Sequence, residues 1–269
     1  MIISDCHMHS SFSSDSTAPM EDMILSAISK GLKIICFTEH MDYDYPIQGN
    51  EDPFIVDMDA YQKCLYELKD KYSKQIEVLF GIELGMMPYL GPKYDALVSQ
   101  YDFDFVLSSS HLVNGQDPYY RTYFEGRNEG DAYREYFQTI IDNVSAFDKF
   151  NAYAHLDYVV RYGPTQNRQF SYIKYMDILE PVLKKLIENG KALEINTGGY
   201  TYGLNEPHPQ MDLLKAFKGL GGENITIGSD AHKPENIGAE FSKVLTILEH
   251  FGFKYYSVYK KGKPEMIKI

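Results

Sequence analysis

Short runs of strand-forming residues alternate with segments of helical periodicity along almost the whole chain. The clearest helical segment covers 58–72, where Met58, Tyr61, Leu65 and Leu68 recur three or four residues apart. Repeated strand–helix units of this length predict a parallel sheet, and this many units predict a closed or nearly closed barrel. The active site of such a barrel lies at the carboxyl ends of its strands.

The other periodic segments complete the predicted order of elements. A first helix follows Pro19 and ends at Gly31. Further helices are expected at 94–100, 130–143, 177–189, 210–218 and 240–251. Strands are expected at the amino terminus and at 34–38, 76–83, 103–109, 151–155, 191–195, 224–228 and 254–259. Two irregular stretches, 41–57 and 113–129, are long enough to be lids or binding loops. We expect residues 1–269 to form a single domain.

Charge and cysteine content narrow the expected partners and compartment. The formal net charge is −12 and no stretch is rich in Lys or Arg, which disfavours nucleic acid and favours a small substrate that can carry positive charge. Cys6, Cys36 and Cys64 form no even disulfide set, and the chain begins without the features of a secretory signal. No apolar run approaches the roughly 18 residues that a membrane helix needs. We therefore expect a cytoplasmic protein without a membrane partner.

Most of the histidines occupy one recurring setting, directly after a strand-forming run and before a polar turn. Runs of this kind lead to His7 and His9, His40, His111, His155 and His232. Imidazole is the commonest metal-ligating side chain and titrates near neutrality. Its repeated placement at one edge of a sheet therefore predicts shared metal coordination or proton chemistry.

His7 and His9 give the sharpest local signal, because residues two apart on a strand point to the same face. Asp5 shares that face and is expected to orient a ligand from behind, whereas Cys6 is expected to face the helices. Imidazoles and carboxylates at matching strand ends complete the candidate metal ligands: Asp15, His40, Glu83, His111, His155, Asp230 and His232.

The motifs around these residues resemble those of the polymerase and histidinol phosphatase (PHP) superfamily. The resemblance rests on His7-Met8-His9 with Ser14-Asp15, Thr38-Glu39-His40, Gly81-Ile82-Glu83, Ser109-Ser110-His111, Ala154-His155-Leu156-Asp157 and Gly228-Ser229-Asp230-Ala231-His232. Their order covers nearly the whole chain, and its length resembles the stand-alone histidinol-phosphate phosphatases of that superfamily. The resemblance implies a distorted (β/α)7 TIM-like barrel that hydrolyses L-histidinol phosphate to L-histidinol and phosphate in L-histidine biosynthesis.

The resemblance also implies three divalent metal ions, for which Zn, Fe, Mn and Co are equally suitable. By match, the first ion takes His7, His9, Glu83 and Asp230, the second takes Glu83, His111 and His155, and the third takes Asp15, His40 and His232. A hydroxide bridging metal ions is the expected nucleophile. Three divalent cations, less three carboxylates and one hydroxide, leave two positive charges, which balance a phosphate monoester dianion. The expected catalytic residues are Glu83, Asp230, His232 and Arg161.

Arg161 is the leading candidate for binding the substrate phosphate. It follows His155 by six residues, and a guanidinium matches phosphate oxygens better than any other side chain. The alternative is an ordinary surface salt bridge. Many relatives carry a second Arg after an Asn-Thr-x-Gly turn, but here Gly199-Tyr200-Thr201-Tyr202 contains none. Arg121 and Arg127 are the candidate replacements.

Three further residues are expected to bind substrate. Asp42 and Tyr43 belong to an acidic loop that would meet the amine and imidazole of histidinol phosphate, and His208 lies in a loop after a predicted strand. Asp157 is expected either to support a metal-ligating side chain or to cap a helix. Glu194 is expected either to ligate a metal ion or to form a buried ion pair with Lys or Arg.

Competing functions remain open on the residues alone. The same site would serve another phosphoester, such as a nucleoside bisphosphate or a DNA end. An amidohydrolase-type C–N hydrolase also begins with His-x-His, but it usually needs a bridging Lys where this chain has Glu83. A non-catalytic metal-binding domain would predict a degraded ligand set, whereas all nine positions are filled. The native metals and the oligomeric state are not determined by the sequence.

Overall fold

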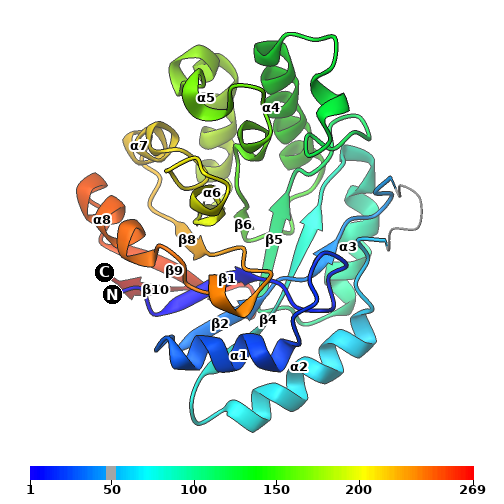
Figure 1. Cartoon of the computed structure of the whole chain (residues 1–269), viewed down its shortest axis with the longest axis vertical. Coiled ribbons are helices and arrows are strands. Elements are labelled where there is room, and N and C mark those ends of the chain that lie inside the picture. Colours follow the sequence, from blue (N-terminus) through cyan, green and yellow to red (C-terminus); the bar gives the residue numbers. More distant parts are fainter. Residues whose placement is uncertain (47–52) are drawn as a thin grey trace.

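The computed structural model describes residues 1–46 and 53–269. Its centre is a parallel sheet in the order β1-β2-β4-β5-β6-β7-β8, with the short β3 paired to β4. The strands are β1 (Ser4–Met8), β2 (Ile34–Phe37), β3 (His40–Met41), β4 (Glu77–Gly85), β5 (Phe105–Ser109), β6 (Ala152–Tyr153), β7 (Ala192–Asn196) and β8 (Ile225–Gly228). Helices surround this sheet on the outside (Figure 1). The predicted distorted (β/α)7 barrel is confirmed.

The barrel closes where the end of β8 meets the end of β1. The amide of His9 donates to the Ala231 carbonyl at 2.9 Å, and the amide of Asp230 donates to the His7 carbonyl at 2.8 Å. Asp5 reinforces this junction, because its carboxylate accepts hydrogen bonds from the amide and hydroxyl of Ser229 and is fully buried. The first and last strands of the barrel are therefore fastened together beside the predicted metal ligands.

The helices cover the barrel because each buries one apolar face. The longer ones are α1 (Met20–Ser29), α2 (Met58–Tyr72), α3 (Gly91–Gln100), α4 (Glu129–Ala146), α5 (Tyr172–Glu188), α7 (Met211–Gly219) and α8 (Phe241–Phe251), and α6 (Gly198–Thr201) is a single turn. Asp57 caps α2 by accepting from the Ala60 amide, and Asn128 caps α4 by accepting from the Gly130 amide. Helix α5 begins five residues before the predicted start, because Tyr175 also packs in the core.

The last strand differs most from expectation. Strand β9 (Tyr255–Lys260) pairs with an unpredicted antiparallel partner, β10 (Lys263–Lys268). The β10 sequence is largely exposed and polar, so it lacks the apolar run by which a strand is recognised. The Tyr256 hydroxyl accepts from the Ile3 amide at 3.1 Å, which places the hairpin at the amino-terminal end of the barrel, away from the histidines. The two chain termini lie close together there (Figure 1).

No helix in the described part of the chain is both long enough and apolar enough to cross a bilayer.

Candidate metal centre

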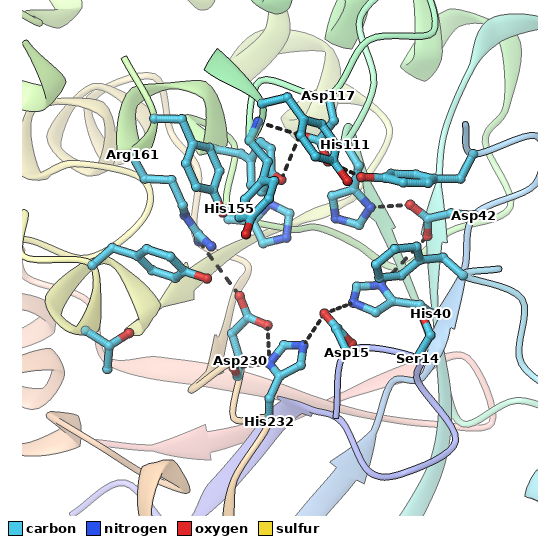
Figure 2. Close-up of a pocket in the computed structure, with 18 of the residues that line it drawn as sticks. Ser14, Asp15, His40, Asp42, His111, Asp117, His155, Arg161, Asp230 and His232 are labelled. Carbon is cyan, nitrogen blue, oxygen red and sulfur yellow. Dashed lines mark hydrogen bonds and ion pairs between the residues drawn. The ribbon is translucent and has the colours of Figure 1, made fainter. Parts of the chain in front are cut away.

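A cavity of about 760 Å³ opens at the carboxyl ends of the barrel strands. His40, His111, His155, Asp230 and His232 lie on its walls, and their side chains converge on one centre (Figure 2). Each of these residues follows a strand or lies at the start of a short one, so the parallel sheet delivers them all to the same edge. The sequence prediction that the histidines share one location agrees with this arrangement.

Glu83 lies at the centre of the cluster, on the long strand β4, and is completely buried. Its Oε1 lies 3.0 Å from Nε2 of His155 and 3.4 Å from Nε2 of His111. Its Oε2 lies 3.1 Å from Nδ1 of His40, and 3.4 and 3.5 Å from the Nε2 atoms of His7 and His9. One carboxylate thus contacts five imidazoles, an arrangement suited to a ligand that bridges ions.

Asp230 and Asp15 extend the cluster toward the cavity. Oδ1 of Asp230 lies 3.4 Å from Nε2 of His7 and 3.5 Å from Nε2 of His9. Oδ2 of Asp15 lies 3.0 Å from Nε2 of His232 and 3.5 Å from Nε2 of His40. The structure therefore brings all nine predicted ligands into one contiguous group.

The donor atoms of this group fit divalent metal ions. Three-residue sets whose ligand atoms lie within 4.8 Å of one another are His7/His9/Glu83, His40/Glu83/His111, His7/His155/Asp230 and His9/His40/His232. The Glu83 Oε2, His40 Nδ1 and His232 Nε2 atoms are buried and make no hydrogen bond in the described part of the chain. Even so, Glu83 Oε2 lies 3.1 Å from His40 Nδ1, and His232 Nε2 lies 3.0 Å from Asp15 Oδ2. Buried polar atoms normally have hydrogen bonds. Buried ligand atoms that converge on one point without a hydrogen-bond partner are typical of a metal-binding site.

Metal ligation requires ionised carboxylates and neutral imidazoles. The carboxylates of the cluster meet this requirement, whereas nearby carboxylates raise the pKa values of His7, His40, His111 and His232 against burial, so metal binding there would release protons. Burial, together with the neighbouring His40 and His232, lowers the pKa of His9 to about 3. Burial opposes ionisation of Glu83, but His7, His111 and His40 outweigh it and hold the Glu83 pKa well below its usual value. The pKa of Asp230 is likewise held well below its usual value against burial, with His7 making the largest contribution.

A second ring of side chains orients the imidazoles. Nδ1 of His7 lies 2.6 Å from Oε1 of Glu194, and Nδ1 of His111 lies 2.5 Å from Oδ2 of Asp42. A partner on Nδ1 fixes the tautomer and turns Nε2 toward the centre. Glu194 is therefore a buried partner of the candidate ligand His7, a role that differs from both the ligation and the pairing with Lys or Arg that were expected for it. Asp5, expected to orient an imidazole, instead fastens β1 to the Ser229 loop.

His9 has a support that sequence reasoning missed. Its Nδ1 lies 3.1 Å from the Ser13 hydroxyl, and that hydroxyl donates to Glu39 at 2.6 Å. The Ser10 hydroxyl also donates to Glu39 at 2.6 Å. The only signal in the sequence was a carboxylate directly before His40, which gives no hint of a contact with the turn after His9.

The backbone at two ligands is held in an uncommon conformation. His155 and Asp230 have φ angles of 22° and 55°, in the left-handed region that residues other than glycine rarely adopt. Such strain persists where surrounding structure enforces it, often at functional sites. Gly228 allows the His7 side chain to lie directly against its backbone, because a Cβ at position 228 would lie 2.3 Å from the His7 Cβ.

Arg161 lies on the cavity wall and is almost fully buried. Its guanidinium carbon lies 4.3 Å from the ring centre of Tyr202 and 5.1 Å from that of Tyr158. Its Nη2 lies 3.8 Å from Oδ2 of Asp230 and has no hydrogen-bond partner in the described part of the chain. A buried, unpaired donor facing the cluster fits the predicted phosphate contact, and the burial of Arg161 excludes an ordinary surface salt bridge.

The predicted substrate contacts are only partly brought to the cavity. Asp42 lines it but is engaged with His111. Tyr43 does not belong to the cavity lining in the described residues, because its ring packs against Tyr94 and beneath Lys93. This placement corrects the expected contact of Tyr43 with substrate.

His208 is also displaced from its expected role. Its side chain is fully buried behind Arg161, and both ring nitrogens are occupied. The predicted direct contact of His208 with substrate is therefore corrected. Of the candidate replacements for a second phosphate-binding Arg, Arg127 is paired with Glu135, and neither Arg127 nor Arg121 lines the cavity among the described residues.

Comparison with known proteins identifies the family. The PHP domain model matches residues 5–198, a span that contains Glu83 and most of the other candidate ligands. The chain belongs to the PHP domain family. Histidinol-phosphatase from Lactococcus lactis subsp. lactis is 32% identical over 268 residues, covering 98% of this chain and 97% of that protein.

Solved structures of similar proteins support the same PHP barrel. The crystal structure of histidinol phosphate phosphatase from Lactococcus lactis, complexed with zinc, L-histidinol and phosphate, superimposes with a TM-score of 0.90 at 31% identity. It covers 97% of this chain and 98% of that one. A structure from Listeria monocytogenes, at 18% identity and a TM-score of 0.77, supports the fold alone.

Proposed function

We propose that this PHP protein is a histidinol-phosphatase, which hydrolyses L-histidinol phosphate to L-histidinol and phosphate in L-histidine biosynthesis. The observation that carries the proposal is the Glu83-centred cluster, open to a cavity with an unpaired Arg161 donor. A relative at 31% identity over nearly the whole chain has been solved with zinc, L-histidinol and phosphate. The proposal also takes residues 1–269 as one domain and the cytoplasm as the compartment.

The cluster is proposed to hold three divalent metal ions, with Zn, Fe, Mn and Co as the candidates. His7, His9, Glu83 and Asp230 would hold the first, Glu83, His111 and His155 the second, and Asp15, His40 and His232 the third. The support is the set of four neighbouring groups of converging ligand atoms. When bound, such ions supply Lewis-acid activation of the phosphoryl group and of the attacking water.

The protein's own residues provide the binding and orientation. Arg161 donates from Nη2 to a phosphate oxygen, and its charge opposes the negative charge that develops on the transferring group. Asp42 and Glu194 hold their imidazole partners in the ligating orientation through the Nδ1 atoms. Burial keeps bulk solvent away from the Glu83 carboxylate, which strengthens its electrostatic contacts with the surrounding imidazoles.

The wall of the cavity beside His111 suits a cationic organic group. Tyr45, Tyr119 and Tyr158 line it together with Asp117. The Asp117 carboxylate accepts from the Tyr45 hydroxyl at 2.6 Å and from the Tyr158 hydroxyl at 3.0 Å. Aromatic faces and a carboxylate attract a cation, and histidinol phosphate carries an amine and an imidazole at the end remote from the phosphate.

Steady-state kinetics on a substrate panel tests the proposal. The metal-loaded protein should hydrolyse L-histidinol phosphate with kcat/KM well above that for p-nitrophenyl phosphate, because remote binding energy contributes to the transition state. Single-stranded DNA should remain uncut. If DNA or a nucleoside bisphosphate is the better substrate, the choice of substrate is wrong, although metal-dependent phosphoester hydrolysis would survive. Absence of phosphoester hydrolysis in metal-loaded protein would refute the proposal as a whole.

A further inference from the structure

We propose that Asp157 and His208 form a buried pair whose role is to position Arg161 for the phosphate of the substrate. The inference rests on the proposed function, since it assigns two positioning residues to the phosphate-binding Arg. It also gives a task to His208, which has a fully buried side chain outside the metal cluster.

The three side chains form a continuous chain of hydrogen bonds. The Arg161 Nε–H donates to Nε2 of His208 at 3.2 Å. Nδ1 of His208 lies 2.5 Å from Oδ1 of Asp157, and Oδ2 of Asp157 accepts from the Gln210 amide at 2.9 Å. Asp157 and His208 are fully buried and Arg161 is 5% exposed, so water does not compete for these bonds. The Asp157 side chain does not cap the short helix that follows it, and it supports His208 rather than a metal ligand, so neither role left open for it describes its contacts.

The protonation of His208 follows from its partners. A guanidinium is always protonated, so Arg161 can only donate and Nε2 of His208 must be the acceptor. The ring proton then resides on Nδ1 and is donated to Asp157. The carboxylate of Asp157 therefore fixes the tautomer that can accept from Arg161, in the way that carboxylates orient functional histidines elsewhere.

The hydrogen bond from Arg161 Nε to His208 holds one edge of the guanidinium and leaves Nη2 without a partner in the described part of the chain. The rings of Tyr158 and Tyr202 confine the guanidinium carbon at 5.1 and 4.3 Å. With Nε engaged by His208, the buried Nη2 lacks a partner among the described residues and lies on the side of Asp230. A single cation held in this manner is especially useful here, because the described residues lining the cavity include only one other Lys or Arg, Lys233.

Two substitutions of His208 separate positioning from simple packing. The amide of Gln reaches roughly to the place of Nε2, so His208→Gln keeps an acceptor for Arg161 and loses the donor to Asp157. The amide of Asn reaches roughly to the place of Nδ1, so His208→Asn keeps the donor to Asp157 and loses the acceptor. A merely structural role predicts similar effects from both variants.

Asp157→Asn supplies an independent variant in case one of these fails to fold. Two donors, the His208 Nδ1–H and the Gln210 amide, bond to the two carboxylate oxygens. Asn replaces one of these two oxygens with an NH2 donor, so one of the two donors at these positions loses its acceptor. If the His208 proton moves to Nε2 in response, that nitrogen no longer accepts from Arg161. Asp157→Asn should therefore weaken phosphate binding in the same direction as His208→Asn.

The experiment measures inorganic phosphate binding by calorimetry on the metal-loaded proteins, together with kcat and KM for L-histidinol phosphate and the metal content. His208→Asn should raise the Kd of phosphate and lower kcat/KM by about tenfold or more, because a buried charged donor loses its partner. His208→Gln should change both by less than about threefold. Metal content should stay at the wild-type value. The exposed His250, changed to Asn and to Gln, is the matched control and should leave every quantity unchanged.

Equal effects of His208→Asn and His208→Gln, or a larger effect of Gln, would overturn the positioning role. Unchanged phosphate affinity in Asp157→Asn would do so as well. Loss of metal in these variants would reassign the pair to support of the metal cluster. Failure of wild-type protein to hydrolyse L-histidinol phosphate would instead refute the proposed function, while the comparison of phosphate affinities would still test the pair.

Discussion

Replacing Arg161 with Lys should reduce both catalysis and stability, by amounts that follow from its contacts. Lys keeps the positive charge but lacks the planar fork and the Nε–H that His208 accepts. Losing a donor to the developing charge should cost about 2 to 4 kcal/mol in kcat/KM. At about 1.36 kcal/mol per factor of ten, this is a reduction of roughly 30- to 900-fold. The unpaired, buried His208 acceptor should separately lower the free energy of unfolding by about 1 to 3 kcal/mol.

Steady-state kinetics with L-histidinol phosphate and urea unfolding measure the two effects of Arg161→Lys. The matched control is Arg134→Lys, because Arg134 is 43% exposed and pairs with Asp177 on the surface. The control should retain kcat/KM within about twofold and change stability by no more than about 1 kcal/mol. If Arg161→Lys also stays within twofold of wild type in kcat/KM, Arg161 does not bind the reacting phosphate.

Three further predictions concern the metal cluster. The double variant His7→Ala/His9→Ala should lose metal and turnover together, and elemental analysis of the wild type should give about three ions per chain; full activity with one ion or fewer would contradict this number. Glu83→Gln should reduce metal content whereas Asp157→Asn should not, because Glu83 contacts imidazoles of the cluster and Asp157 instead contacts His208. Equal metal content in the two variants would remove the bridging role. Gly228→Ala should lower the melting temperature and metal affinity, because the added methyl would overlap the His7 side chain and overpacking costs about 1 to 3 kcal/mol; unaltered metal affinity would show that this close approach is dispensable.

The barrel could be predicted because local patterns determined it. Strand-forming runs and segments of helical periodicity alternate along the chain. The positions of the strands and helices followed from these patterns to within a few residues. The exceptions are elements whose local pattern is weak. Strand β6 has only two residues, and β10 is polar and exposed, so neither carries enough apolar residues to define its length.

The nine candidate ligands could be predicted as a set because parallel strands deliver their carboxyl ends to one edge. Their supporting side chains could not be predicted in the same way. Contact between His208 and Arg161 joins residues 47 positions apart, and the contact between Glu194 and His7 joins residues 187 positions apart. Nothing in either local sequence specifies such a partner. His208 was consequently assigned to the substrate, although the structure places it behind Arg161.

The contact between β1 and the end of β8 has a consequence for the synthesis of this protein on the ribosome. The bond between Asp5 and Ser229 spans 224 residues, and ligands from both sides of this junction, His7 and Asp230, lie 3.4 Å apart. Contacts so distant along a chain require a long loop to close, and they cannot form before both residues have been synthesised. A growing chain that has not yet released the segment after residue 224 holds His7 and His9 without Asp230, one of the carboxylates that lie beside them. Complete metal acquisition and activity should therefore begin only after the segment that carries Asp230 and His232 has been released, so that a polypeptide stalled or truncated before this segment remains inactive.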